Sequence, residues 1–139
     1  MINSPSITLS NGLTVANFSS PHPFNFTTGE VLPACEKKWV KKMSLDIAEN
    51  NLNTAYTMMI GRRKHNPVKI SDIQIKVHVT QIVIDALDKL NKDTNIDIVL
   101  VPFMLLQALK DGGWPHKKCR VIRVADRITK EIYPDKFCI

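Results

Sequence analysis

The second half of the chain changes its hydrophobic period, and this change constrains the fold more than any other feature. Apolar and polar side chains alternate from Ile73 to Val79, which is the period of a half-buried strand. Over 81–91 the apolar residues recur three and four positions apart, as on one face of a helix, and Thr80 can cap its start. The residues on this face are Ile82, Val83, Ala86, Leu87 and Leu90.

A second strand and a second helix follow directly. Residues 96–101 form an apolar run that is typical of a buried strand. Pro102 suits the first turn of a helix that continues through Leu109 and ends at 112–113, where two glycines follow each other. Because helices connect successive strands, we expect part of the sheet to be parallel.

Three antiparallel strand pairs are predicted outside this region. They join 6–9 with 13–18, 24–26 with 30–32, and 120–124 with 128–133. The segment 36–50 is open to two interpretations, helical turns over 36–42 or a strand in which Met43, Leu45 and Ile47 alternate. The pattern predicts an α+β fold, with α/β as the alternative, in a single domain over residues 1–139.

Length and composition fit this prediction. A chain of 139 residues with 44% apolar and 23% charged residues is typical of one globular domain and excludes a collagen-like or disordered chain. The three cysteines are an odd number, and we expect free thiols in a reducing cytoplasm. No secretory signal or membrane-length apolar run is visible, so a cytoplasmic protein without a membrane partner is predicted.

The net charge of +6 is concentrated in a few segments, of which the C-terminal one is the most informative. Four of its cations are candidate ligand-binding residues: Arg120, Arg123, Arg127 and Lys130. Planar guanidinium groups can hold a phosphate or carboxylate through two hydrogen bonds. In a regular strand the side chains of Arg120 and Arg123 point to opposite faces of the sheet. The alternative is that these charges only solubilise exposed strand faces.

A second basic segment covers residues 62–65 and adds Arg62 and Arg63 as candidate anion contacts. Cations in a loop held by a scaffold can neutralise phosphates, and they would make binding to a nucleic acid strongly dependent on salt. Aromatic residues total only 6%, and none lies within this loop, so a platform for stacking single-stranded bases is weakly supported. A solvated turn is the alternative.

His22 and Cys35 stand in unusual surroundings. His22 is flanked by two prolines and is a candidate ligand contact or general base. Cys35 is a candidate nucleophile if a helix begins just after it, because a helix N-terminus lowers the pKa of a thiol. No spacing links these two residues as a catalytic pair, and no catalytic residue is assigned.

Metal and cofactor signatures are missing from the sequence. The histidines and cysteines show no zinc-ligand spacing, so no metal site is predicted. The sequence contains no dinucleotide fingerprint, Walker loop or nucleophile elbow, and no cofactor is predicted.

Three segments of the chain look familiar. They are 17–22 (Asn-Phe-Ser-Ser-Pro-His), 29–35 (Gly-Glu-Val-Leu-Pro-Ala-Cys) and 123–130 (Arg-Val-Ala-Asp-Arg-Ile-Thr-Lys). They resemble segments of small uncharacterised bacterial and phage-type proteins. No activity is known for that group, so the resemblance implies no catalytic role. It implies only a protein that sequesters a signal or component of a host.

These features lead to three hypotheses of function. The first is a non-enzymatic binding module for a phosphate-bearing small ligand of the nucleotide or cyclic-nucleotide type, in which a homodimer or higher homo-oligomer completes a shallow pocket. The second is a small hydrolase that acts on a nucleotide-like substrate through His22 or Cys35. The third is a sequence-independent nucleic-acid-binding protein.

Overall fold

The computed structural model describes residues 4–42, 45–58 and 68–139. The chain divides into two compact units, Met1–Leu45 with Val79–Ile139, and Asp46–His78. The first unit contains β1 (Ser6–Thr8), β2 (Thr14–Asn17), β3 (Phe24–Asn25), β4 (Val31–Leu32), α1 (Lys37–Lys42), α2 (Gln81–Lys92), β7 (Ile98–Leu100), α3 (Phe103–Gly112), β8 (Cys119–Val124) and β9 (Ile132–Cys138). The second contains β5 (Asp46–Met58) and β6 (Val68–His78).

A five-stranded sheet in the order β1-β2-β7-β8-β9 is the centre of the first unit. Its three middle strands, β2, β7 and β8, run parallel, and β1 and β9 pair antiparallel at the two edges. Helix α3 connects β7 to β8. The predicted α+β fold and its partly parallel sheet are therefore confirmed.

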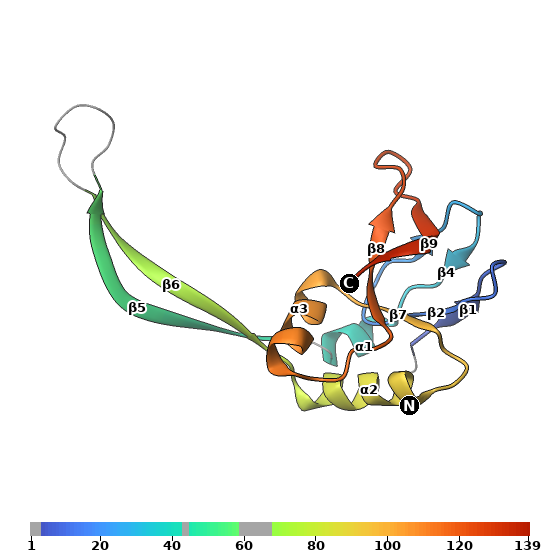
Figure 1. Cartoon of the computed structure of the whole chain (residues 1–139), viewed down its shortest axis with the longest axis horizontal. Helices are drawn as coiled ribbons and strands as arrows, with labels where there is room; N and C mark the ends of the chain where they lie inside the picture. The colour runs from blue at the N-terminus through green and yellow to red at the C-terminus, as the bar shows by residue number, and fades with distance from the viewer. Residues whose placement is uncertain (1–3, 43–44, 59–67) are drawn as a thin grey trace. The chain divides into compact units, whose positions relative to one another are not determined.

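The two faces of this sheet bury different clusters. One face packs against α2 and α3, which Figure 1 shows on the same side of the strands, through Ala16, Phe18, Val83, Leu87, Val99, Val101, Leu105, Leu106, Leu109 and Cys119. The other face packs against the β3–β4 hairpin through Leu9, Val15, Phe26, Leu32, Leu100 and Ile132. Alternate residues of β2 and β7 supply opposite clusters, as the strand period requires.

The open segment 36–50 divides between its two interpretations. Residues Lys37–Lys42 form α1, and the strand begins at Asp46. The predicted hairpins at 6–18 and 24–32 are confirmed, with left-handed backbone at Gly12 (φ 93°) and Gly29 (φ 88°) in their turns.

The predicted last strand, 128–133, is wrong at both ends, because β9 begins at Ile132 and continues to Cys138. Residues 125–131 form a turn in which the Asp126 carboxylate accepts the backbone N–H groups of Ile128 (2.8 Å) and Thr129 (3.2 Å). This turn holds Ile128 out in solvent, where it is 93% exposed. A side chain that bonds its own backbone competes with the ladder of a strand.

The helix boundaries need two smaller corrections. Thr80 stands at the N-cap of α2, but its hydroxyl is buried without a hydrogen-bond partner and does not cap the helix. Pro102 occupies the N-cap of α3 and lies outside its first turn. Gly113, with φ 71°, ends α3 as expected. Ile82, predicted on the buried face of α2, is 51% exposed.

The second unit is a two-stranded antiparallel ribbon. Its register places Asp46 opposite His78 and Met58 opposite Val68, with an irregularity between Asn51 and Ala55. The ribbon therefore leaves the first unit and returns to it at neighbouring residues, since directly paired residues lie about 5 Å apart. Its strands are joined by 59–67, so Arg62, Arg63 and the rest of the predicted basic loop lie outside the described residues.

Removing the ribbon tests whether the first unit folds independently. We expect a chain in which two glycines replace residues 46–78 to unfold cooperatively. The midpoint temperature of its thermal unfolding should lie within a few degrees of that of the full chain. The reason is that both core clusters consist of residues from the first unit, and the cut ends are neighbours. Thermal circular dichroism measures this. A shortened chain without a cooperative transition would show that the ribbon is part of the folding unit.

Candidate functional site

The carboxyl ends of β2, β7 and β8 meet at one edge of the sheet, which is where open sheets with parallel strands commonly bind ligands. A pocket of about 320 Å³ lies there. It is lined by Phe18, Ser19, Ser20, Pro21, Phe24, Leu100, Val101, Pro102, Phe103, Val121 and Ile122. We refer to it as the edge pocket. Its volume is at the small end of the range for small-molecule sites.

The edge pocket brings together two of the predicted segments. Ser19, Ser20 and Pro21 come from the loop that contains His22, and Val121 and Ile122 come from the strand that carries Arg120 and Arg123. These segments lie a hundred residues apart in the sequence, and nothing in their spacing showed that they would meet. Of the predicted cations that the structure describes, Arg120, Arg123, Arg127 and Lys130, none lines the edge pocket itself.

Asn17 fixes the loop that forms one wall of the pocket. Its side chain is fully buried at the end of β2. Its amide nitrogen Nδ2 donates toward the carbonyl oxygens of Pro33 (2.9 Å), Ser20 (3.3 Å) and His22 (3.4 Å), and its Oδ1 accepts the Ser20 N–H (3.1 Å). The Asn17 amide therefore holds the loop from within, together with the Cys35 N–H, which donates to the Ser20 carbonyl oxygen (2.8 Å).

Ser19, at the lip of the pocket, has a left-handed backbone with φ 73°. This region is costly for a residue with a Cβ, and it persists only where the surrounding bonds determine it. Here the bonds are those of Asn17 to Ser20 and the Phe18 N–H to the carbonyl oxygen of Leu100 (3.0 Å). The Ser19 hydroxyl has no hydrogen-bond partner within the described part of the chain, so it is available to a ligand.

Helix α3 begins at the other wall of the pocket. Its first residue, Phe103, lines the pocket and is 67% exposed. No side chain caps this helix, and no acidic residue lies in its first turn. The N–H groups of 103–105 precede the first intrahelical bond, from Leu106 to Pro102, and point toward the same edge. A helix N-terminus carries partial positive charge.

Arg120 does not face this edge. Its Nη1 donates to the carbonyl oxygens of Lys117 and Cys119, each at 2.8 Å, so the guanidinium turns back toward the start of β8. Arg123 is exposed and directly follows Ile122 of the pocket. Arg127 and Lys130 are exposed in the 125–131 turn beyond the strand. Arg120 and Arg123 both adjoin pocket residues in sequence, and Arg123 is the one of the two that is exposed and has no hydrogen bond to backbone carbonyls in the described part of the chain.

His22 and Cys35 occupy opposite environments. The His22 backbone is fixed by Ser20, whose Oγ donates to its carbonyl oxygen (3.0 Å) and accepts its N–H (3.2 Å), while its side chain is exposed at the rim. Cys35 is buried and donates its thiol to the carbonyl oxygen of Asn17 (3.0 Å). Burial raises the pKa of Cys35, whereas a nucleophile needs it lowered. This argues against the hydrolase hypothesis.

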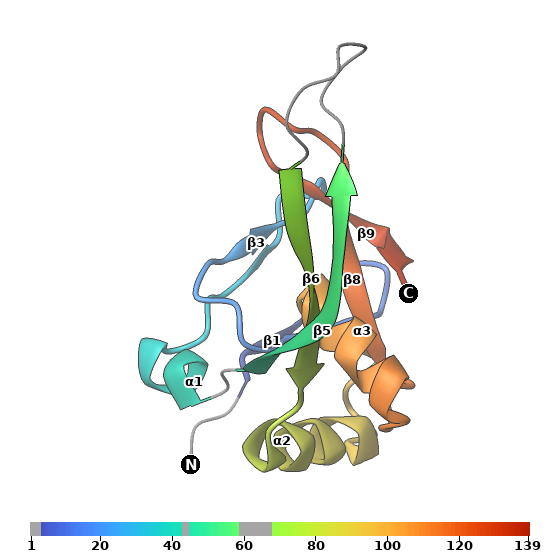
Figure 2. The ribbon, with the colours of Figure 1, turned by 90° about the vertical axis from the view of Figure 1, so that its left-hand side faces the viewer.

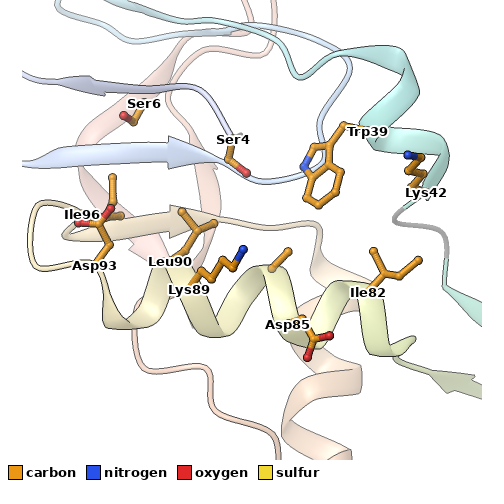
Figure 3. Close-up of a pocket in the computed structure, with 11 residues that line it drawn as sticks. Ser4, Ser6, Trp39, Lys42, Ile82, Asp85, Lys89, Leu90, Asp93 and Ile96 are labelled. Carbon is orange, nitrogen blue, oxygen red and sulfur yellow. The ribbon is translucent and has the colours of Figure 1, made fainter. Parts of the chain in front are cut away.

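A second and larger pocket lies at the opposite end of β7, between α1 and α2 (Figure 3). The views in Figures 1 and 2 show α2 at the end of the sheet away from the 125–131 turn. Within the described ranges there is no group of three or more His, Cys, Asp or Glu side chains that could hold a metal ion. None of the helices in the same ranges has the length and apolar character needed to cross a bilayer.

Removing the Asn17 amide tests its role in the loop. We expect Asn17→Ala to lower the free energy of unfolding by about 2–3 kcal/mol, because the Pro33 carbonyl group and the Ser20 N–H lose their partner. Urea denaturation measures the loss. Asn25→Ala, at an exposed asparagine of the neighbouring hairpin, is the control and should stay within about 0.5 kcal/mol. Equal effects of the two substitutions would contradict the role given to Asn17.

The thiols should react at different rates. Burial raises the pKa of Cys119 to about 11 and also raises that of Cys35, whereas Cys138 is exposed. In native protein at pH 8, iodoacetamide should therefore modify Cys138 first, and the other two only after unfolding. Peptide mass spectrometry over a time course measures this. Modification of Cys35 as fast as Cys138 would restore Cys35 as a candidate nucleophile.

Comparison with known proteins does not identify a relative: the chain matches no protein-family model, no curated protein and no solved structure. The resemblance to small bacterial and phage-type proteins stays a prediction.

Proposed function

We propose that the chain is a binding module for a phosphate-bearing small ligand of the nucleotide or cyclic-nucleotide type, held at the edge pocket. The observation that carries the proposal is that this one pocket is lined from both the loop next to His22 and the strand that carries Arg123, beside an uncapped helix N-terminus. The ligand class is the one expected from the sequence, but its binding site is the pocket at the edge of the sheet and not the group of predicted cations.

The lining favours a ligand with a flat apolar part. Apart from two serines, every lining residue is an aromatic, an aliphatic or a proline. Phe24 and Phe103 supply rings from two different elements, and Phe103 is exposed enough to cover a base by stacking. Stacking accepts any base, because each has a π-face. The lining therefore suits a nucleobase without selecting one.

The surroundings of the pocket favour an anionic group at its rim. The free N–H groups of 103–105 and the partial positive charge of the α3 N-terminus are a common setting for phosphate. The Ser19 hydroxyl is a further donor on the facing wall. Arg123, directly after the pocket residue Ile122, adds a full positive charge that can bind a phosphate through two hydrogen bonds.

A binder without catalysis is favoured over a hydrolase. The exposed His22 imidazole has no hydrogen-bond partner among the described residues that would orient it as a base, and Cys35 is turned inward. Nucleic-acid binding through 62–65 and the basic C-terminal segment, a homodimer or higher homo-oligomer, and the cytoplasmic location stay predictions.

Calorimetric titration of the full chain with adenosine monophosphate, cyclic adenosine monophosphate, adenosine and inorganic phosphate tests the proposal. We expect a nucleotide to bind more tightly than adenosine or phosphate alone, since only it fills the pocket and reaches the α3 N-terminus. Phe103→Ala should weaken nucleotide binding about fivefold or more through the lost stacking. Because Phe103 is largely exposed, this variant should still fold.

Charge variants separate phosphate recognition from general attraction. Arg123→Ala should weaken binding of the nucleotide and leave binding of adenosine unchanged. Lys110→Ala removes an equal charge near the other end of α3 and should leave both unchanged. The proposal is wrong if none of the nucleotides produces heat, or if the two variants weaken nucleotide binding equally.

A further inference from the structure

The pocket between α1 and α2 shares no lining residue with the edge pocket and has a volume of about 770 Å³. It lies at the amino end of β7, where Asp93 and Ile96 precede the strand (Figure 3). The full lining is Ser4, Ser6, Trp39, Lys42, Ile82, Asp85, Ala86, Lys89, Leu90, Asp93 and Ile96. We refer to it as the helix groove.

The helix groove has an apolar floor. Trp39, Ala86 and Leu90 pack against the main core from the side of the groove, and Ile96 is buried beneath it. Ile82 continues this stripe along α2 and is 51% exposed. The apolar face of α2 is thus wider than the area that the rest of the first unit covers, and its uncovered part forms the wall of the groove.

Trp39 supplies an unused hydrogen-bond donor. Figure 3 shows its indole ring extending from α1 toward α2, into the groove. Its Nε1 is buried and has no hydrogen-bond partner among residues 4–42, 45–58 and 68–139. An indole N–H can only donate, and a buried donor without an acceptor carries a desolvation cost. An acceptor atom of a bound ligand would satisfy it.

The charges around this donor favour an anionic acceptor. Lys42 lies three residues after Trp39 on α1, so the two side chains are neighbours on one face of that helix. The two carboxylates of the lining have partners of their own. Asp85 accepts the Gln81 amide (2.8 Å) and points away from Trp39 in Figure 3, and Asp93 accepts the Asn95 N–H (2.9 Å).

We propose that the helix groove binds an amphiphilic carboxylate, a molecule with an alkyl or aryl body and a single carboxyl group. Its carboxylate accepts the Trp39 Nε1–H next to Lys42, and its apolar body lies along Ile82, Ala86 and Leu90. The apolar floor provides affinity in proportion to the apolar ligand area that it removes from water. The Trp39 Nε1–H and the Lys42 ammonium group select the carboxylate end of the ligand.

Fluorescence of Trp39 gives a direct readout. In a Trp114→Phe variant of the full chain, Trp39 is the remaining tryptophan. We expect decanoate, below its micelle concentration, to change the Trp39 emission saturably and to shift the indole N–H resonance downfield. Decanol has the same chain without the charge and should bind about tenfold more weakly.

Substitutions assign the two ends of the ligand by calorimetry. Trp39→Phe and Lys42→Ala should each weaken decanoate binding about fivefold, and Lys42→Ala should leave decanol binding unchanged. Ile82→Glu, at an exposed position, should weaken binding of both. Lys38→Ala removes an equal charge from α1 outside the groove lining and should change neither, and Phe103→Ala at the edge pocket should also change neither. Thermal melts confirm that each variant is folded.

Three outcomes would overturn the proposal. They are no saturable change with either probe, decanol binding as tight as decanoate binding, and an effect of Lys38→Ala equal to that of Lys42→Ala. Without a saturable change, the helix groove is not a binding site. Equal binding of decanol and decanoate would show that the groove does not select a carboxylate, and equal effects of the two lysine substitutions would show that only general charge attraction acts.

Discussion

The side-chain amide of Asn17 is the interaction on which the edge pocket depends. It stands where β2 ends and the chain must leave the sheet, and it bonds the carbonyl oxygens of residues 20, 22 and 33 together. The carbonyl oxygen of the same residue accepts the Cys35 thiol. One buried residue therefore joins the strand, the left-handed Ser19 and the segment after β4. The bond from the Ser20 N–H to this amide acts with that from the Phe18 N–H to Leu100 to hold Ser19 in a costly conformation.

The short parallel strand β7 separates two different chemical environments. At its carboxyl end the chain passes through Pro102 into an uncapped helix, which places free N–H groups beside aromatic rings. At its amino end α1 and α2 leave an apolar groove with one indole donor. The core clusters on both faces of β7 fix its position between them. The strand is therefore a rigid spacer that keeps the two sites independent.

Much of the fold could be predicted from local patterns, some of which report burial. The helical spacing after Gln81 reflects the buried side of α2, which is present. The alternation after Ile73 predicts a strand that is also present, but its Ile73 and Ile75 are 56% and 62% exposed, so there the pattern does not report burial. The start of β9 could not be predicted in this way. Ile128 is apolar and β-branched, but the Asp126 carboxylate bonds the backbone there and draws it into a turn.

The candidate site was only partly predictable, because its contacts join distant residues. The segments around His22 and Arg123 were identified from their composition, but their meeting at one pocket depends on the parallel order of β2, β7 and β8. Arg120 looked equivalent to Arg123, yet its guanidinium bonds carbonyl groups of its own strand. Asn17 gave no signal of its role, since its partners are backbone atoms that only the fold brings near.

The parallel pairing of β2 with β7 also has a consequence during synthesis of the chain. Val15 pairs with Ile98, and the ribosome needs about 4–16 s at 5–20 residues per second to add the roughly 80 residues between them. For that interval β2 can pair only with β1, and Val15 and Phe18 lack the strand that later buries them. The β1–β2 hairpin is therefore a stage at which a growing chain exposes apolar surface to other growing chains or to chaperones.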